Sequence, residues 1–218
     1  MAVSSEVKLI EYSEKVDMGN SLTHAFGAVA AAAAAVMLFL KADGARSIIS
    51  ALIYGLSLTA VYVASATYHG LKKSEAKRIA RLVDHAAIPV LIAGTATPCA
   101  LITLYEISVF HSVLVFVLAW SCAIFGLVSK LFFFQKLRKI TMAVYIISCM
   151  VMLVSVVPLL GEIKKEAFGG IVWGNVAYLI GAFFCWLGIK REAMHVVFHI
   201  FVLFGSAIHF IIIYIFMY

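Results

Sequence analysis

Seven long stretches of apolar residues dominate the chain, and short segments that hold most of the charged residues separate them. The stretches are residues 20–40, 47–71, 85–104, 108–129, 140–160, 170–189 and 194–217. Each is about as long as the roughly 20 apolar residues that a helix needs to cross the hydrocarbon core of a bilayer. None alternates apolar with polar residues as the strands of a membrane β-barrel do. The pattern therefore predicts an all-α fold, a bundle of seven transmembrane helices.

The segments between the apolar stretches are too short to hold a second folded domain. We expect residues 1–19 to form an N-terminal segment and residues 20–218 to form one transmembrane domain. The link at residues 105–107 is so short that the stretches on either side of it must form an antiparallel hairpin. Residues 1–19 mix acidic and basic side chains, unlike the positively charged start of a secretory signal peptide. The first stretch is therefore expected to remain in the protein as a helix.

The composition excludes a water-soluble domain. Hydrophobic residues make up 64% of the chain and charged residues 13%. Soluble domains are about 45–50% apolar and about 25% charged. We therefore predict a multi-pass protein of the cell membrane, with membrane lipids as its surroundings.

The distribution of Lys and Arg between the loops predicts the orientation in the membrane. Thirteen of these residues fall in the segments at residues 1–19, 72–84, 130–139 and 190–193, and the other four fall in the intervening loops. Because Lys and Arg are enriched in cytoplasmic loops, the N-terminus is expected in the cytoplasm and the C-terminus outside. The basic cytoplasmic loops would then contact anionic lipid headgroups. No basic face stands apart from the membrane ends, so we expect no nucleic-acid partner.

Polar residues within the apolar stretches indicate a candidate site. His195 and His199 are four residues apart and share one face of the last helix. His69 ends the second stretch and Asp84 precedes the third, so the predicted topology brings all four residues to the cytoplasmic side. Three imidazoles with an open fourth position are typical of a catalytic zinc site, whereas a structural zinc usually has a fourth protein ligand such as Cys. No cysteine is expected at this depth. A pair of hydrogen-bonded histidines is the alternative interpretation of His195 and His199.

Ser65 and Asp84 each have two interpretations. The hydroxyl of Ser65 can bond back to its own helix, and Asp84 can cap the third helix. Beside three histidines, they are better explained as groups that orient a water molecule at the metal, with Asp84 as the proton acceptor. A catalytic triad of Ser65, His69 and Asp84 is less favoured, because it leaves the histidine pair of the last helix without a role.

Several further polar or small residues stand out. Asn20 and His24 start the first helix and are expected to contact a substrate, to brace the site or, for Asn20, to cap the helix. His209 lies roughly 20 Å deeper than His195 and is expected to make an interhelical hydrogen bond. Gly94, Pro98 and Gly205 are typical of close helix packing or of a helix kink.

Four motifs together resemble the hemolysin III family, which belongs to the progestin and adiponectin receptor superfamily. The motifs are Asn20-Ser-Leu-Thr-His24, Ser65-Ala-Thr-Tyr-His69, residues 84–98 and residues 195–209. The resemblance covers nearly the whole chain. It implies seven helices and a Zn²⁺ site on the cytoplasmic side, with His69, His195 and His199 as ligands and with Ser65 and Asp84 beside the metal.

The same resemblance suggests a function. Distant relatives in the superfamily include alkaline ceramidases, which implies a zinc-dependent lipid amide hydrolase that acts in membrane lipid homeostasis. A lipid substrate would enter between the helices. The alternative is a non-enzymatic receptor or regulator, or a hemolysin-like pore-forming protein, in which zinc is structural. A pore would require a continuous polar stripe on several helices, whereas the polar groups here gather at one depth.

Overall fold

A computed structural model describes residues 7–218, which form helices and no strand. The long helices are α2 (Glu14–Lys41), α3 (Gly44–Gly70), α4 (Glu75–Pro98), α6 (Val109–Phe132), α7 (Arg138–Ser155), α8 (Lys165–Leu187) and α9 (Ala193–Phe216). Short elements extend two of them: a π-helical turn at Cys99–Leu104 and α5 (Tyr105–Ile107) follow α4, and a 3₁₀ turn at Val157–Leu159 follows α7. Seven helical segments are long and apolar enough to cross a membrane, which confirms the predicted all-α, seven-span fold.

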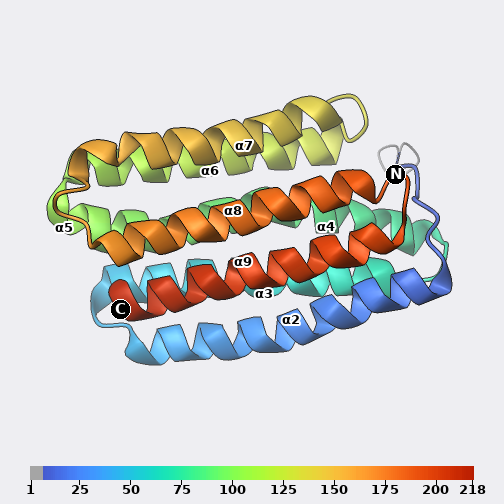
Figure 1. Cartoon of the computed structure of the whole chain (residues 1–218), viewed down its shortest axis with the longest axis horizontal. Coiled ribbons are helices and arrows are strands. Elements are labelled where there is room, and N and C mark those ends of the chain that lie inside the picture. The colour runs from blue at the N-terminus through green and yellow to red at the C-terminus, as the bar shows by residue number, and fades with distance from the viewer. Residues whose placement is uncertain (1–6) are drawn as a thin grey trace.

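The long helices run side by side along the long axis of the molecule (Figure 1). Helices α6 and α7 form one side of the bundle, α2 forms the opposite side, and α3, α4, α8 and α9 lie between them. Neighbouring helices pack in the pairs α2–α3, α3–α4, α4–α6 and α6–α7, while α9 packs against both α8 and α2. The described chain begins and ends at opposite ends of the bundle, as an odd number of spans requires.

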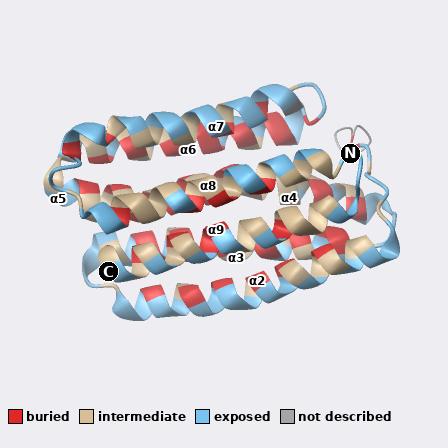
Figure 2. Ribbon diagram, viewed as in Figure 1, coloured by how far each residue is buried: buried red, intermediate tan, exposed pale blue. Residues whose placement is uncertain are grey.

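The outer surface of the bundle is apolar, as a lipid environment requires. Phe26, Val29 and Leu40 on α2 are 71%, 73% and 79% exposed. Figure 2 shows that exposed positions follow the outward faces of the helices, while buried positions face the interior. The interior includes an apolar cluster around Tyr54, Tyr62 and Ile213, contributed by α3 and α9. The apolar outer surface formed by the exposed side chains is stable in hydrocarbon and not in water.

Small residues allow the inner helices to approach closely. A Cβ atom at Gly94 would lie 2.0 Å from Ser57 Oγ, and one at Gly205 would lie 2.8 Å from the ring of Tyr178. Any larger residue would therefore push α4 away from α3, or α9 away from α8. This confirms the close packing predicted for both glycines.

Candidate metal centre

Three imidazoles from two helices meet at the end of the bundle where the described chain begins. His69 lies in the last turn of α3, and His195 and His199 lie in the first turns of α9. One possible ligand nitrogen from each lies within 4.8 Å of the others. The structure therefore brings together the histidines that the sequence predicted to be neighbours, with a separation that a single metal ion can bridge.

Two of the three imidazoles are shielded from solvent, and one of them has a buried nitrogen without a hydrogen-bond partner in the described part of the chain. His199 is 1% exposed and His69 is 3% exposed. His69 Nδ1 lies 2.8 Å from Asp17 Oδ1, while the buried Nε2 has no hydrogen-bond partner among the described residues. A metal-ligating histidine commonly has its other ring nitrogen bonded to a carboxylate. The donor set fits zinc, which binds neutral imidazole nitrogens.

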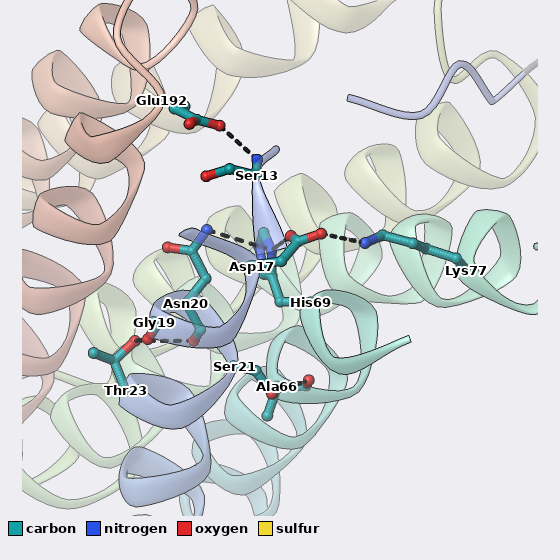
Figure 3. Close-up of polar contacts among 10 residues, drawn as sticks. All are labelled: Ser13, Asp17, Gly19, Asn20, Ser21, Thr23, Ala66, His69, Lys77 and Glu192. Carbon is teal, nitrogen blue, oxygen red and sulfur yellow. Dashed lines mark hydrogen bonds and ion pairs between the residues drawn. The ribbon is translucent and has the colours of Figure 1, made fainter. Parts of the chain in front are cut away.

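Asp17 and Lys77 extend the site outward from His69, and the sequence analysis missed both residues. Lys77 Nζ lies 2.6 Å from Asp17 Oδ2, and Lys77 is only 5% exposed (Figure 3). The chain Lys77–Asp17–His69 thus joins α4, α2 and α3. A signal was available in the sequence, because Asp17 precedes Asn20 by one helical turn and so shares its face.

The first helix braces the cluster. His24 on α2 stacks on His199 with ring centroids 3.8 Å apart, and Asn20 is fully buried with its Nδ2 atom 3.4 Å from His69 Nδ1. Ser21 donates a hydrogen bond to the Ala66 carbonyl at 2.9 Å, which ties α2 to the last turns of α3 (Figure 3). Asn20 and His24 therefore both contact the histidine cluster, as one of the interpretations expected. The capping interpretation of Asn20 is wrong, because α2 begins at Glu14 and its N-cap is Ser13.

Ser65 and Asp84 are joined to each other, and the capping interpretation of Asp84 is wrong. The Ser65 side chain hydrogen-bonds the Asp84 carboxylate, and Ser65 lies one turn before His69 on α3. Helix α4 begins at Glu75, and its N-cap is Ser74, whose side chain accepts a hydrogen bond from the Lys77 backbone N–H at 3.2 Å. Asp84 consequently lies inside the helix, because α4 starts before its apolar part does.

Two other expectations had opposite outcomes. His209 Nε2 lies 3.2 Å from the Ile171 carbonyl on α8, which confirms the predicted interhelical hydrogen bond. The expectation that no cysteine lies at the depth of the cluster is wrong, since Cys185 Sγ is 4.0 Å from His195 Nδ1. Helix α8 ends at Leu187 and α9 begins at Ala193, so their adjacent ends meet beside the cluster. Cys185 does not belong to the three-residue group whose ligand atoms lie within 4.8 Å of one another.

The segment just before α2 also reaches the cluster. The ring of Tyr12 stacks on His195 with centroids 5.0 Å apart and an interplanar angle of 24°. Burial raises the pKa of the Tyr12 phenol, so this side chain is neutral at physiological pH. The neighbouring Glu11 pairs with Lys73, and the hydrogen bond from that ammonium lowers the pKa of the Glu11 carboxyl. Nothing in the residue pattern before the first apolar stretch predicted this contact.

Comparison with known proteins gives consistent results over most of the chain. The model of the family described as "Haemolysin-III related" matches residues 12–210. Hemolysin-3 of Bacillus cereus is 32% identical over 200 residues, which cover 90% of this chain and 89% of the relative. The Hemolysin-3 homolog of Bacillus subtilis (strain 168) is also 32% identical over 200 residues, covering 90% of this chain and 92% of the relative.

Proposed function

The chain belongs to the haemolysin-III related family of multi-pass membrane proteins, and we propose that it is a zinc-dependent lipid amide hydrolase. His69, His195 and His199 would hold the ion on the cytoplasmic side of the membrane. The observation that carries this proposal is the group of three imidazoles within 4.8 Å of one another, in which the buried Nε2 of His69 has no hydrogen-bond partner among the described residues. An unsatisfied buried nitrogen is costly unless something binds it.

Four further polar side chains of the candidate site, beside the three imidazoles, each have a role in this proposal. Bound zinc would supply a Lewis acid that polarises a carbonyl group and makes a water molecule more acidic. Asp84 is the proton acceptor, and Ser65 holds its carboxylate through their hydrogen bond. Asp17 fixes the ring of His69, and Lys77 in turn holds Asp17. The apolar outer surface of the helices makes membrane lipid the substrate class within reach.

A second candidate function is a receptor or regulator in which zinc only holds the helices together. The proximity of Cys185 to His195 favours it, because a thiolate from α8 would complete a closed, four-ligand site. The name of the Bacillus relatives, Hemolysin-3, raises pore formation as another non-enzymatic role. The gathering of the imidazoles at one end of the bundle argues for a local site over a continuous polar path.

Asp84→Asn separates the hydrolase from the structural site. Three imidazoles remain to hold the ion, so zinc content should equal that of the wild type. An amide is a poor proton acceptor near neutral pH, so turnover of lipid amides should fall by roughly 10²–10⁴-fold. Zinc and lipid products are measured on the same purified preparations, by elemental analysis and mass spectrometry. Asp43→Asn, an exposed acid at the opposite end of the bundle, is the matched control and should retain both.

Two results would contradict the hydrolase. One is a zinc-loaded wild type with no turnover of any lipid amide or ester, which supports the structural role. The other is loss of the metal in Asp84→Asn, which makes Asp84 a ligand and the site closed.

A further inference from the structure

Residues 7–13, which we call the N-terminal arm, cross the end of the bundle that holds the histidine cluster. Ser13 donates a backbone hydrogen bond to Glu192 Oε2 at 2.7 Å, just before α9 begins (Figure 3). Glu11 forms an ion pair with Lys73, just after α3 ends. The arm is therefore attached beside both helices that contribute imidazoles to the cluster.

The side chain of Tyr12 lies between these two attachment points and contacts two of the three imidazoles. Its ring stacks on His195 at 5.0 Å and contacts His69 at 5.7 Å between centroids. Val7, at the other end of the arm, is fully buried. The arm thus holds an aromatic ring against the imidazoles at the end of the bundle.

The ion pair that attaches the arm to the end of α3 is weak. The side chains of Glu11 and Lys73 are 77% and 71% exposed, and ion pairs this exposed contribute little to stability and are screened by salt. The other contacts of the arm are the hydrogen bond of Ser13, the stacking of the Tyr12 ring and the buried side chain of Val7. A short segment held at a few points, one of them an exposed ion pair, can open locally while the helices stay folded.

We propose that the N-terminal arm is a lid on the metal centre, with Tyr12 as the plug that controls exchange of ions and water with the aqueous phase. The part of this proposal that concerns the ion rests on the zinc site proposed above. The closure itself does not, and it can be tested on protein without metal.

Cys185 provides the metal-independent test, because its thiol lies 4.0 Å from Nδ1 of His195, the ring on which Tyr12 stacks. Metal-free wild type and Tyr12→Ala are treated with a water-soluble maleimide, and labelling of each cysteine is followed by peptide mass spectrometry. Labelling of Cys185 should be about two- to tenfold faster in Tyr12→Ala, the ratio that loss of one aromatic stacking contact implies. Cys149 on α7 serves as the internal reference and should be labelled at the same rate in both proteins.

Two variants control for a general loosening of the fold. Tyr105→Ala removes a partly exposed tyrosine at the opposite end of the bundle and should leave Cys185 labelling unchanged. Lys73→Gln breaks the ion pair of the arm and should accelerate labelling even if Tyr12→Ala does not fold. Lys72→Gln, the adjacent residue, should not accelerate it. Equal Cys185 labelling in wild type, Tyr12→Ala and Lys73→Gln would overturn the lid.

The second measurement follows zinc release to a chelator from loaded protein. Tyr12→Ala should release zinc faster than the wild type at equal stoichiometry. Raising the salt concentration should accelerate release from the wild type and not from Lys73→Gln, since only the wild type has the Glu11–Lys73 pair to screen. A wild type that binds no zinc would defeat the proposed function, while the Cys185 assay would still decide the lid. Release that is independent of both substitutions would contradict control of ion exchange by the arm.

Discussion

Among single residues, Asp17 joins three helices at the candidate site, because it lies on α2 and contacts His69 on α3 and Lys77 on α4. One carboxylate oxygen lies 2.8 Å from His69 Nδ1 and the other lies 2.6 Å from Lys77 Nζ. The carboxylate therefore fixes the orientation of the His69 ring, and the lysine compensates its charge. The position of one acidic side chain at the start of α2 thus determines which nitrogen of His69 faces the cluster.

Asp17→Asn should weaken zinc binding by roughly 10–100-fold without abolishing it, because the three imidazoles stay while the carboxylate that orients one of them is lost. Competition with a chromophoric chelator measures the affinity. Glu14→Gln, an exposed acid in the same helical turn, is the control. The double variant Asp17→Asn/Lys77→Gln avoids leaving a buried lysine without its counter-charge. Wild-type affinity in both Asp17 variants would remove Asp17 from the site.

The histidines were predictable from the sequence, whereas their contacts with Tyr12 and Cys185 were not. The spacing of His195 and His199 places them on one helix face, and the count of spans places His69 at the same end. Tyr12 reaches the cluster through the path of the N-terminal arm, and Cys185 reaches it where α8 meets α9. Those contacts depend on tertiary packing, which no local pattern of residues encodes.

For the elements, hydropathy located the part of each helix that lies in the membrane and not the whole helix. Helix α4 was expected from residue 85 but begins at Glu75, capped by Ser74, and α2 begins at Glu14, within the predicted N-terminal segment. Both helices extend beyond their apolar parts because polar residues are also good helix formers. These extensions carry Lys77 and Asp17 to the cluster, so the polar helix ends that hydropathy overlooks provide the outer part of the site.

For the whole molecule, the arrangement of the helices agrees with the charge pattern of the loops. The structure places the beginning and the end of the described chain at opposite ends of the bundle, and the histidine cluster lies at the end where it begins. Residues 1–6 of the predicted N-terminal segment lie outside the described residues. The orientation of the bundle in the membrane remains a prediction from the thirteen-to-four distribution of Lys and Arg.

Reporter fusions test this orientation. A reporter joined before residue 7 and one inserted in the α6–α7 connection, at residues 133–137, should both report the cytoplasm. A reporter after Tyr218 should report the outside. The inserted reporter is an internal control, because it must agree with the first one in any bundle of this topology. The same compartment for the first and last fusions would contradict the seven-span topology.

The central claim is that His69, His195 and His199 hold a zinc ion, and the most direct test is the zinc content of the purified protein. Wild type should contain about one zinc per chain, as expected for a mononuclear site. The double variant His195→Ala/His199→Ala should contain almost none and should unfold at a lower temperature, because an ion bound only by the folded state stabilises it. His111→Ala, at the opposite end of the bundle, should retain the metal. Equal zinc content in the wild type and the double variant would contradict the account.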